Sequence, residues 1–246
     1  FYSPNDAESP WAVLGGSVEM LATLAYAGEH SPTVWLPGGI SQAGLFLEAG
    51  REYIARLVVA GAALRGPIEV ALCWGREPGQ RVTTIIEHVE EEYASVTRTL
   101  VLPAASENGR LEIVGHGKGA MRLGAASLMP ADNVHGMRRD ALDALKRLNA
   151  SVYRWPGGAF VDHYDWREGV GERDRRPPRL NPAQEALESH DFGFDEFMAF
   201  CSETCAEPFV AVNSSEGSVR LAVDEVRYAN DPGDKGPATL RAEHGR

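Results

Sequence analysis

The densest group of side chains that could do chemistry lies in residues 154–166, Arg-Trp-Pro-Gly-Gly-Ala-Phe-Val-Asp-His-Tyr-Asp-Trp. Its aromatic rings can stack on the apolar C–H faces of a sugar ring, and its Arg, Asp and His side chains can form hydrogen bonds with sugar hydroxyls. The mixture therefore suits a neutral polyol as a ligand. A structured loop whose aromatic side chains pack over the end of a sheet explains the same composition equally well.

The position of this segment favours a binding role. It begins in a short apolar run that we predict to be a strand, residues 152–155, and Pro156-Gly157-Gly158 closes that run. Glycine lets the chain turn sharply and lets another group approach the backbone. Folds with parallel strands bind their ligands beyond the C-terminal ends of the strands.

Two other motifs carry weaker signals. Asp162, His163 and Asp165 could bind a divalent metal, but a hydrogen-bonded histidine in a polar loop is the favoured interpretation. Residues 115–119, Gly-His-Gly-Lys-Gly, lack the spacing of a phosphate-binding loop and are predicted to form a tight turn. We therefore expect neither a metal nor a cofactor.

The charge balance excludes some partners. Asp and Glu number 35 against 24 Lys and Arg, a net charge of −11, which repels nucleic acid and anionic lipid. The basic stretch 173–179 is predicted to be a solvated or salt-bridged loop, because acidic residues flank it. No run approaches the ~18 apolar residues of a membrane span. The cellular location stays open, with the cytoplasm slightly favoured over secretion.

The three cysteines are expected to be structural. Cys73 falls in a predicted strand, while Cys201 and Cys205 are four residues apart on a predicted helix. Thiols with that helical spacing are poorly placed for a disulfide, and two thiols without a nearby histidine pair make a poor zinc site. We predict that all three are buried as small apolar side chains.

The first half of the chain, residues 1–129, has the pattern of a β-sandwich. Short runs rich in β-branched and aromatic residues alternate with turn signals at roughly 8–12-residue spacing. In one such run, Tyr53, Ala55 and Leu57 occupy alternate positions and therefore fall on one face. The predicted strands are residues 43–48, 52–60, 68–74, 81–88, 93–102, 110–114 and 121–128.

The second half, residues 130–246, changes to helical periodicity. Apolar spacing predicts a helix over 135–148, with Asp132 or Asn133 capping its first turn. The elements predicted to follow are a strand at 152–155, a helix at 195–205, a strand at 208–212 and a helix at 219–228. This order implies parallel strands. Its length fits a small open sheet or about half of a (β/α)₈ barrel, and periodicity does not choose between them.

Several stretches in order resemble glycoside hydrolase family fifty-one, the α-L-arabinofuranosidases. Two of them are Tyr-Arg-Trp-Pro-Gly-Gly at 153–158 and Tyr-Asp-Trp-Arg-Glu-Gly-Val-Gly at 164–171. The others are residues 129–136, 145–149, 173–179, 191–198 and 207–213. The resemblance implies a carbohydrate-binding-module-like β-sandwich (jelly roll) followed by the N-terminal part of an incomplete (β/α)₈ TIM barrel.

The resemblance also implies a chemistry. Family members are retaining hydrolases, which need two carboxylates about 5–5.5 Å apart, and both catalytic Glu residues are expected to lie beyond Arg246. The substrate-orienting residue is then Arg154. The rest of the expected sugar-binding wall is Trp155, Tyr164, Trp166 and Asn213.

The expected activity belongs to the full-length parent, with this segment inactive alone. The parent is expected to release terminal α-L-arabinofuranosyl groups from plant-type, arabinose-containing oligo- or polysaccharides, and it could form a homo-oligomer. Two departures keep alternatives open, because Ala159 stands where the family usually has Asn and Gln184 where it usually has Trp. A non-catalytic carbohydrate-binding protein, or a related glycosidase acting on another glycan, is the alternative.

Overall fold

The computed structural model describes residues 3–5, 9–182 and 184–245. The chain divides into two compact units, Phe1–Gly136 and Met137–Arg246, and each has its own hydrophobic cluster. Within the described residues, no helix is long and apolar enough to cross a membrane.

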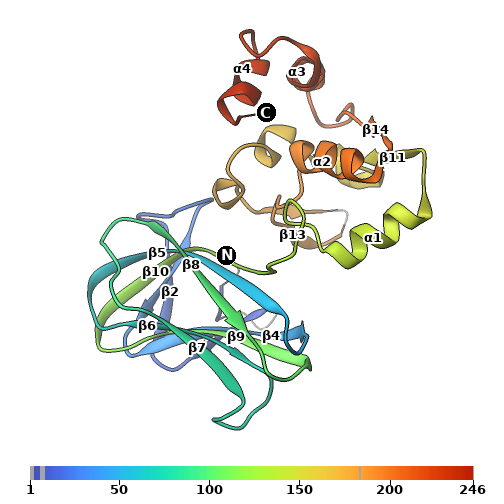
Figure 1. The fold of residues 1–246 in the computed structure, drawn as a ribbon. Coiled ribbons are helices and arrows are strands. Elements are labelled where there is room, and N and C mark those ends of the chain that lie inside the picture. The colour runs from blue at the N-terminus through green and yellow to red at the C-terminus, as the bar shows by residue number, and fades with distance from the viewer. Residues whose placement is uncertain (1–2, 6–8, 183, 246) are drawn as a thin grey trace. The chain divides into compact units, whose positions relative to one another are not determined.

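The first unit is a sandwich of two five-stranded antiparallel sheets (Figure 1), as the sequence predicts. One sheet has the order β1 (Trp11–Leu14), β4 (Gly38–Leu47), β9 (Ser106–Gly115), β6 (Ile68–Cys73) and β7 (Arg81–Ile86). The other has the order β2 (Ser17–Leu21), β3 (Ser31–Trp35), β10 (Lys118–Pro130), β5 (Glu52–Arg65) and β8 (Ala94–Val101). The seven predicted strands correspond to β4–β10, whereas β1–β3 were not predicted.

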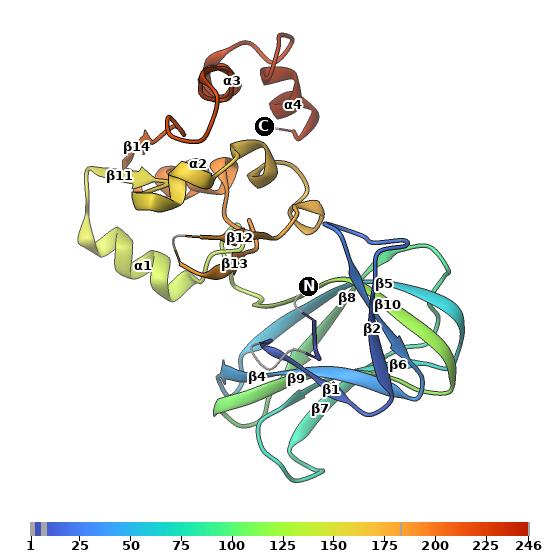
Figure 2. The same ribbon diagram turned by 180° about the vertical axis from the view of Figure 1, so that it is seen from behind.

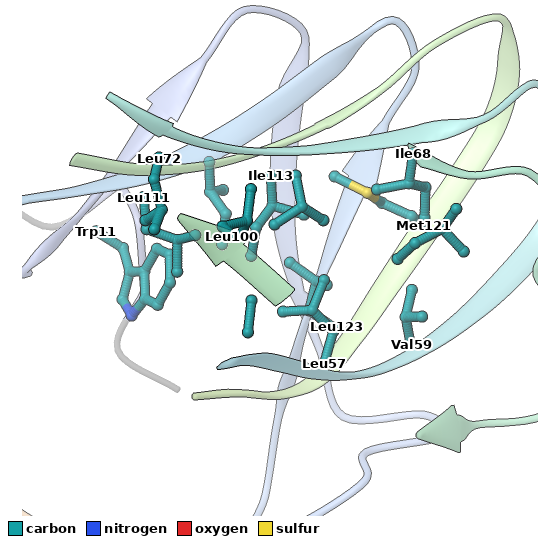
Figure 3. Packing of buried hydrophobic residues seen from close by; sticks show 14 of the residues in the cluster. Trp11, Leu57, Val59, Ile68, Leu72, Leu100, Leu111, Ile113, Met121 and Leu123 are labelled. Atoms are coloured by element: carbon teal, nitrogen blue, oxygen red, sulfur yellow. The ribbon is translucent and has the colours of Figure 1, made fainter. Parts of the chain in front are cut away.

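The core of the sandwich lies between the sheets (Figure 3). Tyr53, Ala55 and Leu57 are buried on the inner face of β5, which confirms the predicted alternation. Ile113 of β9 and Met121 of β10 are fully buried in the same cluster. Burying an aliphatic side chain of this size contributes about 1.5–3 kcal/mol, so such residues supply most of the unit's stability.

Two glycines help to set where strands of the sandwich begin and end. β4 begins at Gly38 rather than at residue 43, because a Cβ on Gly39 would lie 2.4 Å from the Ile113 carbonyl oxygen of β9 and only glycine permits that approach. Gly117, with a φ of 89°, makes the turn between β9 and β10. The tight turn predicted for residues 115–119 is thus confirmed.

The second unit is built on a parallel pair of strands, β11 (Val152–Trp155) and β14 (Glu207–Val210), with α2 (Phe194–Thr204) between them in the chain. α1 (Arg139–Leu148) precedes β11, and α3 (Val219–Asn230) and α4 (Ala238–Glu243) follow β14. This order confirms the predicted α/β segment. The long connection from β11 to α2 contains three short 3₁₀ helices, Gly158–His163, Trp166–Gly169 and Arg173–Arg175, and the hairpin of β12 (Arg179–Asn181) and β13 (Ala186–Glu188) (Figure 2).

The start of α1 differs from the prediction. The helix begins at Arg139, and neither Asp132 nor Asn133 caps it. Asn133 instead accepts a hydrogen bond from the Gly136 N–H at 2.9 Å, within a turn that contains the left-handed residues His135 and Gly136. Left-handed backbone cannot continue a right-handed helix, so the helix starts only after this turn.

One cysteine prediction was wrong. Cys73 and Cys201 are buried free thiols, but Cys205 is exposed. Cys205 ends α2 in the left-handed conformation, with a φ of 56°. An unbroken helix would have turned Cys205 toward the core, as it does Cys201 one turn earlier. Because α2 ends at Thr204, Cys205 stays exposed.

A buried ion pair anchors the connection from β11 to α2. The guanidinium of Arg176 donates to both carboxylate oxygens of Glu196, at 2.7 and 3.0 Å, and also to the His190 and Gly171 carbonyl oxygens at 2.9 and 2.8 Å. Glu196 in turn accepts from the Gly193 N–H at 2.9 Å at the start of α2. The salt-bridged loop predicted for residues 173–179 is confirmed.

The protonation of Glu196 follows from these contacts. Burial by itself would raise the pKa of Glu196, but the hydrogen bonds and positive charge of Arg176 outweigh burial, so the pKa lies below its ordinary value. The carboxylate therefore stays charged under ordinary conditions.

We predict that Ile113→Ala lowers the free energy of unfolding of the sandwich by about 2–5 kcal/mol, because the truncated side chain leaves a cavity in a closed core. Urea unfolding followed by tryptophan fluorescence measures the change. Ile85→Ala makes the same truncation at a partly exposed position of β7 and should cost less than about 1 kcal/mol. Equal losses in the two variants would contradict the assigned core.

We predict that Glu196→Gln destabilises the second unit by about 3–5 kcal/mol near neutral pH, because Arg176 is left buried without its anionic partner. Urea unfolding followed by helical circular dichroism measures the loss. The matched control is Glu168→Gln, which breaks the more exposed pair with Arg179 and should cost no more than about 1 kcal/mol.

The loss from Glu196→Gln should depend on pH. Because the folded pKa of Glu196 is depressed, its stabilisation is complete above the unfolded pKa of about 4.3 and disappears as the pH falls through the folded value. The parent and Glu196→Gln chains should thus converge in stability at acidic pH. A constant difference down to strongly acidic pH would refute the assigned charge state.

Candidate functional site

The candidate site lies at the C-terminal ends of the two parallel strands. Arg154 and Trp155 end β11, opposite Phe209 and Val210 of β14. The first 3₁₀ helix follows β11, and Asn213 follows β14. Parallel pairing therefore brings together two loops that are about 50 residues apart in the chain.

Arg154 is the most accessible of the predicted sugar-binding residues. Its side chain is exposed, and its guanidinium lies against the backbone of Gly157, where an added Cβ would be 3.2 Å from Nη2. Arg154 and Trp155 also line a cavity of 430 Å³ with Arg138 and Phe192. A planar guanidinium at this place can offer several N–H donors to hydroxyl groups.

Trp155 is partly buried within an aromatic cluster. Its ring centroid lies 5.3 Å from that of Tyr164 and 5.7 Å from that of Phe197, both within the usual range of aromatic pairs. Tyr164 is buried, and burial raises the pKa of its hydroxyl above the ordinary value. Tyr164 therefore remains neutral, and its ring supports one side of Trp155.

Trp166 lies in the interior, with 2% of its surface exposed. Its indole Nε1 donates to the Leu221 carbonyl oxygen of α3 at 3.1 Å, and its ring packs on Tyr228 with 4.8 Å between centroids. The residue thus joins the connection after β11 to α3.

Asn213 ties the two loops together. Its side-chain nitrogen donates to the carbonyl oxygens of Asp162 and Tyr164 at 3.0 and 3.2 Å. Its side-chain oxygen accepts from the N–H groups of Ser215 and Gly217 at 3.1 and 3.0 Å. The amide has therefore used both donors and both acceptor positions on main-chain groups.

His163 is hydrogen-bonded within a loop, which confirms the favoured interpretation, although its partner was not predicted. His163 Nδ1 lies 2.8 Å from Glu216 Oε2, which joins the first 3₁₀ helix to the loop after β14. The two residues are 53 positions apart, and no local pattern signals such a pair. Across the part of the chain that the structure describes, no three His, Cys, Asp or Glu side chains gather as a metal site would require. Ala159 and Gln184 are both exposed.

Known proteins that are similar to this chain are named as α-L-arabinofuranosidases. A family model described as "Alpha-L-arabinofuranosidase 1 domain" matches residues 144–246. The probable alpha-L-arabinofuranosidase C of Aspergillus clavatus is 41% identical over 117 residues, which are 48% of this chain and 23% of the relative. An intracellular exo-alpha-L-arabinofuranosidase of Bacteroides ovatus is 31% identical over 193 residues, 78% of this chain and 35% of the relative.

One solved structure of an alpha-L-arabinofuranosidase is also similar to part of this chain. The alpha-L-arabinofuranosidase from Thermotoga maritima, in an arabinose complex, is 38% identical over 46% of this chain and 24% of its own, with a TM-score of 0.45. The chain thus spans between about a quarter and about a third of the length of these relatives. Over residues 144–246 the chain matches the α-L-arabinofuranosidase family model, and relatives of that name are 41% and 31% identical to it.

Proposed function

We propose that the longer protein to which this chain belongs is a retaining α-L-arabinofuranosidase. Its reaction would release terminal α-L-arabinofuranosyl groups from plant-type polysaccharides by double displacement, with two glutamates supplied from outside residues 1–246. The family match over residues 144–246 is the observation that carries this proposal. The named activity of relatives at 31% and 41% identity supports it.

Within that enzyme we propose that Arg154 orients the substrate. Its exposure at the end of a parallel strand supports direct contact with a sugar hydroxyl. Trp155 would offer the open part of its ring to the sugar. Tyr164, Trp166 and Asn213 would complete the wall, and the hydrogen bonds and ring contacts of these three buried residues suit a role in holding Arg154 and Trp155 in place.

The proposed partner is an arabinose-containing oligo- or polysaccharide. We propose the cytoplasm as the location, supported by the name of the Bacteroides ovatus relative, an intracellular enzyme. A reporter fused to the longer protein, followed by cell fractionation, tests the location.

A second candidate function is carbohydrate binding without hydrolysis. Ala159 and Gln184 favour it, because neither a methyl group nor an amide can replace the Asn and Trp that the resemblance leads one to expect. A sugar hydroxyl that loses its hydrogen-bond partner in a binding site costs about 1–3 kcal/mol. Such a protein would bind an arabinoside or another glycan without hydrolysing it.

We predict that this chain alone does not hydrolyse p-nitrophenyl α-L-arabinofuranoside, whereas the longer protein does, since a retaining mechanism needs both carboxylates. Release of p-nitrophenol measures the difference. The longer protein with its two catalytic glutamates changed to glutamine is the control for contaminating activity. Turnover by this chain alone, with the control silent, would refute the assignment of the carboxylates. Binding without turnover by the folded longer protein would favour the second candidate.

We predict that Arg154→Ala lowers kcat/KM of the longer protein about tenfold to a hundredfold, because a hydrogen bond from a charged donor contributes about 1.5–3 kcal/mol. Arg154→Lys, which keeps the charge but loses the planar donor set, should fall between the parent and the alanine variant. Arg147→Ala, at an exposed arginine of α1, is the matched control and should leave the rate unchanged. An unchanged rate in Arg154→Ala would remove Arg154 from the site.

A further inference from the structure

A second cavity in the α/β unit has no role in the proposed reaction. It measures 650 Å³ and lies among α2, β14, α3 and Arg241 of α4. Its walls are mostly apolar, including Met198, Val210 and Ala229. Cavities of about 300–1,000 Å³ with apolar walls and a few polar groups are typical of small-ligand sites.

The polar group that distinguishes this cavity is the carboxyl group of Glu225. Glu225 lies on α3, lines the cavity and has 3% of its surface exposed. Among the described residues, no hydrogen-bond donor contacts its buried Oε1, and no described ion pair includes Glu225. A buried carboxyl group without an ion-pair partner is costly, so a group in the cavity that pairs with the Glu225 carboxyl would be bound favourably.

Two other charged side chains of the cavity wall already have hydrogen-bond partners. Asp195 accepts a hydrogen bond from the Tyr228 hydroxyl at 3.0 Å. The guanidinium of Arg241 donates to the Tyr228 and Asp231 carbonyl oxygens, which lie at the C-terminal end of α3. Asn230, the remaining polar wall residue, donates to the Val226 carbonyl oxygen at 2.8 Å. Glu225 is the charged wall residue with a buried oxygen that has no described partner.

The local charge indicates what kind of ligand would be bound. Burial raises the pKa of Glu225 to about 7, and the negative charge of Asp165 adds to this effect. A positively charged group beside Glu225 would offset both the cost of burying its charge and the repulsion from Asp165. A neutral donor would satisfy the hydrogen bond but leave the charge uncompensated.

We propose that this cavity binds an organic cation, an ammonium or guanidinium group on a short apolar stem, with Glu225 as its anionic partner. The apolar walls would bury the stem while the charged end meets the carboxylate. The cation could be free, or it could be a lysine or arginine side chain from the part of the protein outside residues 1–246. Both sources present the same chemistry to the cavity.

The test uses n-butylammonium, the analogue of a lysine side chain, and n-butanol as its neutral counterpart. We expect n-butylammonium to bind this chain in the millimolar range and to lower the pKa of Glu225, both followed by NMR of ¹³C-labelled glutamate. Since Glu225 ionises around pH 7 and the amine stays charged, affinity should rise about tenfold from pH 6 to pH 8. Glu225→Gln should lose this gain, while Glu243→Gln, at an exposed acid of α4, should keep it.

A second variant keeps the proposal testable if Glu225→Gln perturbs folding. Ala229→Lys places an ammonium four residues after Glu225 on the same helix, and Ala229 already lines the cavity. It should lower the pKa of Glu225 and exclude n-butylammonium. Equal binding of n-butanol and n-butylammonium, or binding unaffected by Glu225→Gln, would overturn the proposal, as would no binding to a chain whose helical circular dichroism shows it folded.

The longer protein distinguishes the two sources of the cation. If a side chain of the same polypeptide fills the cavity, the pKa of Glu225 is already low there and n-butylammonium no longer binds. If the cation is free, the longer protein binds n-butylammonium as this chain does. A high pKa of Glu225 in the longer protein without any amine binding would overturn the proposal in both forms.

Discussion

The α/β unit depends on the bidentate pair between Arg176 and Glu196. Residues 156–193, which connect β11 to α2, form a connection much longer than the usual two to six residues between a strand and a helix. Arg176 holds this connection through two carbonyl oxygens and the carboxylate, and Glu196 transmits the constraint to the first turn of α2. The pair therefore fixes the middle of the connection to its C-terminal end and to the start of α2.

The two units are stabilised in different ways. The sandwich closes its core between two sheets, so nonlocal packing of aliphatic side chains supplies its stability. The α/β unit has a smaller, largely aromatic cluster and relies on specific polar contacts such as the indole N–H of Trp166. Its α3 also leaves Val219, Val223 and Val226 exposed, which are apolar positions of one helix face. The α/β unit therefore has a smaller apolar core to stabilise it than the sandwich has.

Much of this fold could be predicted from the sequence, for reasons that particular elements make clear. β5 and β10 are long, with 14 and 13 residues, and were predicted. In contrast, β1–β3 have only four or five residues each, and β3 contains a proline that argues against a strand. The segment 154–166 could be recognised as chemically rich. Its composition could not tell that Trp166 packs inside, because stacking on a ligand and packing on a neighbour need the same side chain. The pair of His163 and Glu216 depends on the meeting of two loops, which no local pattern reports.

The hydrogen bonding of Asn213 has a consequence for how such a site can evolve. Because all four bonds of the amide go to main-chain groups, the paths of both loops are specified without reference to the side chains that the loops display. Exposed positions such as residue 159 can then be exchanged by mutation while the backbone beneath them stays the same. A single buried amide thus lets evolution keep the backbone of the site while it varies the exposed side chains that face a ligand.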